Sequence, residues 1–181
     1  VIKEDGYGWV YTPRKLANRA IYALSSTNTF ILDPDGTLRV WGKDRLTRGD
    51  NRRKNPLKPA KILDNVTQFS SSLSHTLALK KDGSLWTWGR NAFGILGNGT
   101  GDNKLVPTKV LDDVIAVSAH DSHMAAIKKD GSLWTWGRNT YGQLGDGTEI
   151  DKRAPVHIMD GVRLPANTAD YKTEILNCRE A

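Results

Sequence analysis

A twelve-residue phrase, KKDGSLWTWGRN, occurs twice in this chain, at residues 80–91 and again, 48 residues later, at residues 128–139. Identity over twelve positions does not arise by chance, so the chain contains an internal repeat. Such a repeat either performs the same chemistry twice or forms the structural unit of a repeat fold. How the repeat folds therefore decides how its tryptophans, histidines and glycines are interpreted.

The repeat extends well beyond the identical phrase. The offset of 48 also aligns His75 with His123, and an offset of 47 in the other direction gives a degenerate copy in which Trp41 matches Trp88. The segment KEDGYGWVY, at residues 3–11, is a remnant of a further copy. We divide the chain into a remnant hairpin (1–12), a degenerate repeat (13–66), two clear repeats (67–114 and 115–162) and a non-repeat tail (163–181).

Each repeat is predicted to form four short antiparallel strands. The apolar runs HTLAL and LWTWG flank Lys-Asp-Gly, and a glycine at the end of such a turn accepts the positive φ angle of a tight hairpin. The runs VPTKV and VIAVS complete the unit. The register also places residues 21–24 on a strand, although the composition around them favours a helix. Four short strands in each repeat predict the blade of a β-propeller, which makes the fold all-β.

The chain has material for a partial propeller of about three to four four-stranded blades. An open arc would leave the apolar flanks of its terminal blades in water, together with unpaired strand edges. Three solutions remain open: further blades in a longer chain, self-association of two copies to close the ring, or tight closure with four blades. The tail carries helix formers at residues 168–179, so we expect a short C-terminal helix there.

The recurring tryptophans and glycines are expected to have structural roles. Because the tryptophans recur at a fixed register, inter-blade packing is favoured over a recognition platform for rings or cations. The glycines are expected to occupy turns with positive φ angles. The residues assigned to the repeat scaffold are Trp41, Gly83, Trp86, Trp88, Gly89, Gly131, Trp134, Trp136 and Gly137.

One segment, the basic loop at residues 43–61, departs from the repeat. Its eight Lys and Arg residues, set against Asp44 and Asp50, give a surplus of six, which equals the net charge of +6 of the whole chain. The loop is interpreted as a feature that the fold does not require. It is either a solvated surface loop or a patch for an anionic partner such as an acidic protein, nucleic acid or a cell-wall polyanion. The candidate binding residues are Arg45, Arg48, Arg52, Arg53, Lys54 and Lys58.

No pattern in the sequence predicts an enzyme, a cofactor or a metal. The G-x-S-x-G and phosphate-loop patterns are missing, and His120 and His123 would project from opposite faces of a strand. Cys178 is the single cysteine, which excludes an internal disulfide. Apolar runs are too short to span a bilayer. The compartment is not fixed by the sequence, although a secreted or cell-surface location is favoured over the cytoplasm.

The string W-G-x-N-x-[FY]-G-x-L-G-x-G-T, at residues 88–100 and 136–148, resembles the regulator of chromosome condensation (alpha-tubulin suppressor-like) repeat family. The copies are most similar to bacterial members, and the resemblance covers roughly residues 13–162. It implies a β-propeller, usually of seven blades, that works through protein–protein contacts. Family members include an exchange factor for the small GTPase Ran, a plant ultraviolet receptor and a secreted inhibitor of β-lactamase. Their functional residues do not transfer, because only the repeat skeleton aligns.

These observations predict a non-enzymatic scaffold that binds a protein partner through the loops between its strands. The loops in question are residues 43–61, 92–106 and 140–154. The alternative is a regulator that binds a small GTPase, as a guanine-nucleotide exchange factor does, or that binds nucleic acid or chromatin through the basic loop.

Overall fold

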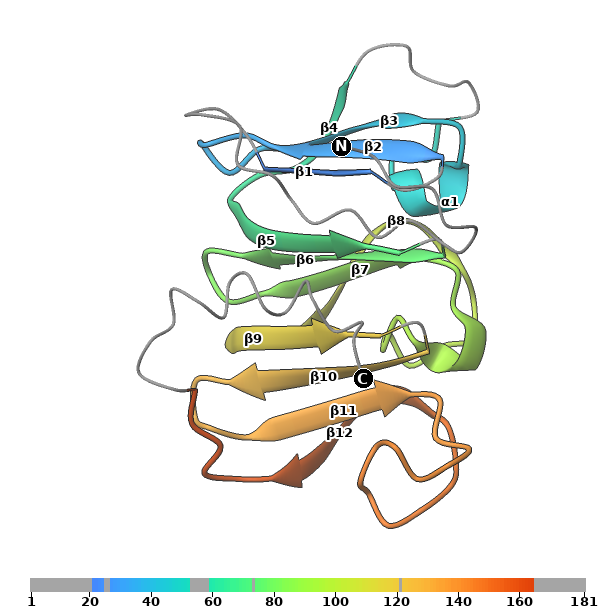
Figure 1. Ribbon diagram of the computed structural model, residues 1–181, viewed down its shortest axis with the longest axis vertical. Coiled ribbons are helices and arrows are strands. Elements are labelled where there is room, and N and C mark those ends of the chain that lie inside the picture. Colours follow the sequence, from blue (N-terminus) through green and yellow to red (C-terminus); the bar gives the residue numbers. More distant parts are fainter. Residues whose placement is uncertain (1–20, 25–26, 53–58, 73, 121, 165–181) are drawn as a thin grey trace, which may run out of the picture.

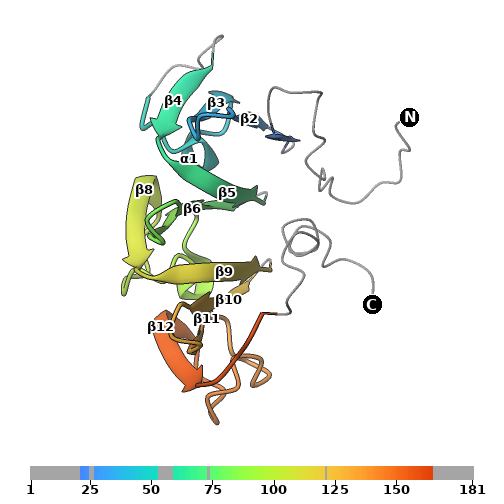
Figure 2. The ribbon, with the colours of Figure 1, turned by 90° about the vertical axis from the view of Figure 1, so that its left-hand side faces the viewer.

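The computed structural model describes residues 21–24, 27–52, 59–72, 74–120 and 122–164 as three four-stranded antiparallel sheets stacked in an arc (Figures 1 and 2). Blade 1 contains β1 (Ile21–Leu24), β2 (Asn28–Leu32), β3 (Leu38–Gly42) and β4 (Ala60–Leu63). Blade 2 contains β5 (Val66–Ser71), β6 (His75–Lys80), β7 (Leu85–Gly89) and β8 (Lys104–Leu111). Blade 3 contains β9 (Val114–Ala119), β10 (His123–Lys128), β11 (Leu133–Gly137) and β12 (Lys152–Met159). The all-β, partial-propeller prediction is confirmed.

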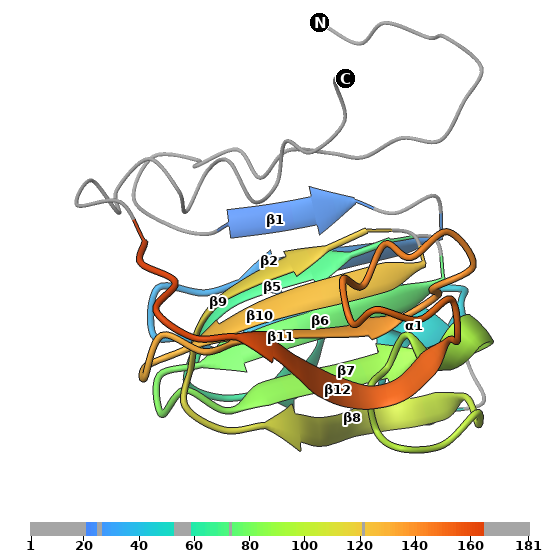
Figure 3. The ribbon, with the colours of Figure 1, turned by 90° about the horizontal axis from the view of Figure 1, so that it is seen from below.

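The strands of each blade follow one another in chain order from an inner to an outer edge. Figure 3 shows β1, β5 and β9 on one side of the arc and β8 and β12 on the other. The prediction of a strand at residues 21–24 is confirmed, since these residues pair with β2 as β1. The repeat register therefore outweighs the helical composition of that segment. Tertiary pairing routinely overrides local propensity in this way.

The hairpin between β6 and β7 shows how the Lys-Asp-Gly turn works. Gly83 adopts a φ of 83° and donates its N–H to the carbonyl of Lys80 at 3.0 Å. Its own carbonyl accepts the N–H of Val114, the first residue of the next blade, at 2.9 Å. The hairpin tip therefore ties each blade to its successor. The equivalent bond joins Val66 to Gly36 at 2.9 Å.

The hydrophobic core lies between the blades. One cluster joins Phe30, Leu32, Leu38 and Val40 of blade 1 to Val66, Phe69, Ala78 and Trp88 of blade 2. A second joins Leu77, Leu79, Leu85, Ile95 and Leu96 of blade 2 to Val114, Val117, Met124, Ala126 and Trp136 of blade 3. Blade 2 thus has an apolar face on each side. For each blade, we call the face toward the preceding blade its upstream face and the face toward the following blade its downstream face.

Two short helices interrupt the strands, α1 (Arg45–Arg48) between β3 and β4 and the 3-10 helix η1 (Ala92–Gly94) between β7 and β8. Neither they nor any other helix in the described part of the chain has the length and hydrophobicity of a membrane span. The predicted remnant hairpin at residues 1–12 and the predicted helix at residues 168–179 lie outside the described residues.

Candidate functional site

Two tryptophans of the repeat phrase are completely buried between neighbouring blades. The indole N–H of Trp88 donates to the carbonyl of Thr47 at 2.7 Å, and that of Trp136 donates to the carbonyl of Ile95 at 2.9 Å. Each indole therefore binds the turn that follows the third strand of the preceding blade. A buried indole N–H without an acceptor would be costly, so this bond fixes the spacing of the two blades.

The other two tryptophans of the phrase make their contacts within one blade. Trp86 and Trp134 are half-buried, and their N–H groups donate to the hydroxyls of Ser84 and Ser132 at 2.9 and 2.8 Å. A lysine ammonium group lies over each indole, at 5.6 and 5.4 Å from the ring centroids. These contacts of the two side chains thus lie within their own blades and do not join neighbouring blades.

The first half of the basic loop is part of the fold, and the interpretation that the fold does not require it is wrong for residues 44–50. Asp44 caps α1 by accepting the N–H of Leu46 at 2.9 Å. Asn28 donates to the carbonyl of Asp44 at 2.7 Å and to the hydroxyl of Thr47 at 2.8 Å. Because Thr47 is also the acceptor for Trp88, this turn occupies the place that residues 92–98 occupy in blade 2.

Arg48, a candidate binding residue, is 1% exposed and lies at the position of the buried Leu96 of blade 2. Its guanidinium donates to Asp50 at 2.7 Å, to the carbonyl of Gly42 at 2.8 Å and to that of Arg52 at 2.6 Å. All three of its nitrogens are therefore engaged inside the turn. Arg48 is not available to an anionic partner, and its role is structural.

The remaining basic residues of the loop are dispersed. Arg52 is exposed, with its Nε 3.9 Å from Asp50, and Arg45 donates to the side chain of Asn51 at 2.7 Å. The candidates Arg53, Lys54 and Lys58 lie outside the described residues. Arg48 and Arg52 thus both lie near the buried carboxylate of Asp50, whereas Arg45 contacts the side chain of Asn51 instead. Among the described residues, no cluster of three or more metal-ligating side chains is found.

Two long turns, residues 90–103 and 138–151, form a second candidate region on the same side of the arc as α1. Each is organised by the buried asparagine of the W-G-x-N motif. Asn91 donates to the carbonyl of Thr100 at 2.8 Å and accepts the N–H of Leu96 at 2.9 Å. Asn139 makes the equivalent pair of bonds at the same distances in blade 3. A buried, fully bonded amide of this kind holds an irregular turn in one conformation.

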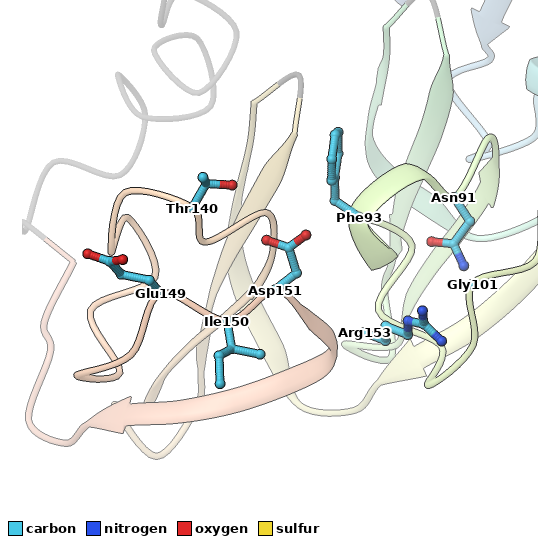
Figure 4. A pocket seen from close by; sticks show the side chains of 8 residues that line it. All are labelled: Asn91, Phe93, Gly101, Thr140, Glu149, Ile150, Asp151 and Arg153. Carbon is cyan, nitrogen blue, oxygen red and sulfur yellow. The ribbon is translucent and has the colours of Figure 1, made fainter.

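A cavity of about 650 Å³ lies where these two turns meet (Figure 4). Arg153, at the beginning of β12, joins its two sides, since its carbonyl accepts the N–H of Gly99 at 2.8 Å. We call this region the loop cleft. Its lining residues are Asn91, Phe93, Gly101, Thr140, Glu149, Ile150, Asp151 and Arg153.

The loop cleft is bordered by exposed apolar side chains. Phe93 is 48% exposed, Ile150 is 67% exposed and Tyr141 is 81% exposed. The guanidinium of Arg138 lies between the two aromatic residues, 5.1 Å from the Phe93 ring centroid and 5.6 Å from that of Tyr141. Phe93 also has a φ of 60°, an unfavourable backbone conformation for a bulky residue. Such strain persists only where the surrounding structure holds it, and it is concentrated at functional sites.

The charges of the loop cleft are only partly neutralised. Beside the cleft, the Lys152 ammonium lies 3.0 Å from Asp146, and together with hydroxyl and amide donors it holds the pKa of Asp146 far below its usual range. Asp151 accepts the backbone N–H of Asn139 at 2.7 Å. Within the described ranges, Glu149 and Arg153 make no ion pair with any side chain. A partner would therefore meet one carboxylate and one guanidinium that are not already paired.

The repeat pattern predicts recognition in these loops but does not single out Phe93, Arg138 or Tyr141. Both aromatic residues occupy the [FY] position of the repeat motif and were therefore treated as part of its skeleton. The available signal was a large apolar residue inside a polar, glycine-rich turn. Such a residue has no sheet to pack against and is commonly exposed.

Comparison with known proteins agrees with this architecture. Two profiles of the "Regulator of chromosome condensation (RCC1) repeat" match the chain, one at residues 82–127 and 130–166 and the other at residues 66–95 and 114–143. The E3 ubiquitin-protein ligase MYCBP2 of Danio rerio is 32% identical over 96 residues, which are 50% of this chain and 2% of that protein.

The fold is also found in solved structures of yeast RCC1. The structure of Kap60 bound to yeast RCC1 (Prp20) superimposes with a TM-score of 0.65 at 21% identity, covering 90% of this chain and 46% of that chain. The structure of Prp20p from Saccharomyces cerevisiae, whose description names binding to Gsp1p and histones, gives 0.62 at 22% identity, covering 90% and 48%. This chain thus spans about half of that fold. The repeat phrase, the blades that it builds and these matches together establish that the chain belongs to the regulator of chromosome condensation (RCC1) repeat family.

Proposed function

We propose that this protein is a non-enzymatic scaffold that binds a protein partner through the loop cleft. The observation that carries the proposal is the exposed group formed by Phe93, Arg138 and Tyr141 beside the cavity. Aromatic and arginine side chains are the residue types that dominate binding energy at protein interfaces. Exposed apolar clusters rimmed by polar groups are also typical of interaction surfaces.

The scaffold supports this role because it holds the two turns rigidly. The turns are fixed by Asn91 and Asn139, and the blades beneath them are locked together by Trp136. A preorganised surface loses little conformational entropy on binding. The yeast relative, which is described as binding Kap60, Gsp1p and histones, is consistent with a propeller that works through protein contacts.

The chemistry of the loop cleft indicates the kind of segment that it would accept. Ile150 and Phe93 offer apolar contacts, while Glu149 and Arg153 offer one charge of each sign. We infer a peptide segment that carries a large apolar or aromatic side chain beside charged residues. The cavity of about 650 Å³ is large enough for more than one such side chain.

The test is a selection of random-sequence peptides displayed on phage against the immobilised 181-residue chain, followed by affinity measurements on the enriched peptides. Phe93→Asn removes the ring but keeps a residue that tolerates positive φ. It is expected to weaken binding by roughly tenfold or more, as is Tyr141→Ala. Val106→Ser removes an exposed apolar side chain that does not line the cleft, and it should leave the affinity unchanged. Equal affinity for all four proteins would show that the loop cleft is not the binding surface.

The alternative, a regulator that binds a GTPase or nucleic acid through the basic loop, remains a prediction. The engagement of Arg48 inside the turn removes one of its six candidate contacts. A salt-dependent association with duplex DNA that requires Arg52 would favour this alternative over the loop cleft.

A further inference from the structure

The two inter-blade junctions of this chain share one construction. At each, an indole of the following blade lies against a glycine that has a positive φ, Gly49 at 77° and Gly97 at 70°. A Cβ atom at either glycine would lie 2.5 or 2.6 Å from the nitrogen of the indole of Trp88 or Trp136. Only glycine leaves room for the ring, so each junction is a slot formed by a glycine and the carbonyl two residues before it.

Blade 3 carries the same slot on its downstream face. Gly145 is the equivalent of Gly97 and has a φ of 74°. Among the described residues, the nearest atom to a Cβ placed there is a methyl carbon of Ile158, at 3.8 Å, which is ordinary van der Waals contact. The carbonyl of Gln143 stands where that of Ile95 accepts the indole N–H in blade 2. Within the described part of the chain, no indole fills this slot.

The turn that forms the slot at Gly145 has the same internal hydrogen bonds as the turn at Gly97, whose slot holds Trp136. The hydroxyl of Thr135 donates to the carbonyl of Leu144 at 2.8 Å, as Thr87 donates to Leu96 at 2.7 Å. Asn139 holds the turn with the same bonds that Asn91 makes. The geometry therefore does not depend on the presence of a following blade.

The apolar side chains of blade 3 that surround the slot are less buried than the equivalent side chains of blade 2. Ile127 and Leu133 of blade 3 are only partly buried, whereas the equivalent Leu79 and Leu85 of blade 2 are fully buried. The downstream face of blade 3 is thus apolar, and it resembles the downstream face of blade 2, on which blade 3 packs.

The complementary group lies at the opposite end of the arc. Trp41 occupies the position of Trp88 and Trp136 on the upstream face of blade 1, with Ile31 in place of the small Ala78 and Ala126. Trp41 is half-buried, and no hydrogen bond of its indole N–H is found within the described residues. Among the residues that the structure describes, the arc therefore has an indole slot without an indole at one end and an indole N–H without a hydrogen bond at the other.

We propose that a second copy of this chain fills the slot, so that Trp41 of each copy inserts beside Gly145 of the other. This junction is head-to-tail, and two arcs joined twice in this way form a closed ring with two-fold symmetry. The span of the arc fits this arrangement, because 90% of this chain covers 46% of the yeast RCC1 chain. Two arcs of this size contain about as much chain as one complete ring. The proposal does not depend on the function of the loop cleft.

The experiment is analytical ultracentrifugation of the 181-residue chain and its variants. The wild-type chain is expected to sediment as a dimer, at twice its mass of 20.0 kDa. Gly145→Leu places a side chain in the slot, and it is expected to weaken the dimer by roughly 30-fold or more. Gly147→Leu is the matched control, because Gly147 has a φ of 76° in the same turn but no atom of the described residues lies within 4 Å of a Cβ placed there. It imposes the same backbone strain and should leave the dimer intact.

Complementation distinguishes a head-to-tail junction from any other. Trp41→Ala and Gly145→Leu should each dimerise weakly alone, yet associate more tightly with each other when mixed, because the mixture restores one intact junction. Circular dichroism of each variant checks that it remains folded. Four results would overturn the proposal: a monomeric wild-type chain, a dimer insensitive to both substitutions, an open series of larger assemblies, or a monomer that dimerises only after residues 165–181 are deleted. The last result would show that the tail occupies the slot.

Discussion

Replacement of Trp136 by alanine is expected to lower the free energy of unfolding by about 3–5 kcal/mol, the range for truncating a large buried aromatic residue. The indole is completely buried between blades 2 and 3, and its removal leaves both a cavity and an unpaired carbonyl at Ile95. Urea unfolding followed by far-ultraviolet circular dichroism measures the loss without relying on tryptophan fluorescence.

Trp134 supplies the matched control for this substitution. It lies two residues away on the same strand, but it is half-buried and donates to Ser132 of its own blade. Trp134→Ala is therefore expected to cost only about 1–2 kcal/mol, an ordinary effect for a partly exposed site. If both substitutions lower the free energy of unfolding equally, the packing of Trp136 between blades 2 and 3 does not hold these blades together.

Asp50→Ala is expected to destabilise the protein by about 3–5 kcal/mol, because it removes the carboxylate partner of a buried guanidinium. Arg48 and Asp50 are 1% and 4% exposed, and their ion pair spans 2.7 Å. Without Asp50, the buried charge of Arg48 keeps only carbonyl partners. Thermal and urea unfolding of the variant would measure the loss.

The double substitution Arg48→Leu with Asp50→Asn provides the contrast, since blade 2 carries Leu96 and Asn98 at these positions. Replacing a buried ion pair by residues of suitable volume is commonly neutral or stabilising by about 1–4 kcal/mol. The double variant should therefore be at least as stable as the wild type. If it is instead as unstable as Asp50→Ala, the basic turn of blade 1 and the glycine-rich turn of blade 2 are not equivalent.

The repeat made the blades predictable from sequence, but the two tryptophans of the phrase could not be distinguished in this way. Trp86 and Trp88 share one face of β7, and alternation treats them alike. Their difference arises from another blade, because the turn at Thr47 reaches Trp88 and does not reach Trp86. Burial that depends on a contact 41 residues away along the chain leaves no local signal.

The structural role of residues 44–50 was not predictable, because the composition of the basic loop conceals its register. Gly49 follows Gly42 by seven positions, whereas Gly97 follows Gly89 by eight positions, so a fixed offset does not align the two turns. Charge also suggests a surface, but Arg48 has taken the place of a buried leucine. A positive net charge concentrated in one segment therefore does not by itself locate a binding patch.

The loop cleft was predictable only as a region. The sequence places residues 92–106 and 140–154 in loops, and loops on a rigid scaffold are the usual carriers of function. Arg138 and Tyr141 belong to the same turn, but the contact of Arg138 with Phe93 joins blades 2 and 3, and the sequence alone does not predict it. The pairing of Trp41 with the slot at Gly145 likewise required the two filled junctions as templates.

Buried indoles of blades 2 and 3 each donate a hydrogen bond to a turn of the preceding blade, and this bond holds neighbouring blades together. Hydrogen exchange of the indole N–H groups, observed by nuclear magnetic resonance, tests it most directly. The N–H groups of Trp88 and Trp136 are expected to exchange only on global unfolding, because they are buried and bonded across the inter-blade junction. Those of Trp86 and Trp134 are expected to exchange much faster. Rapid exchange at Trp88 and Trp136, at the rate of the half-buried pair, would contradict the account.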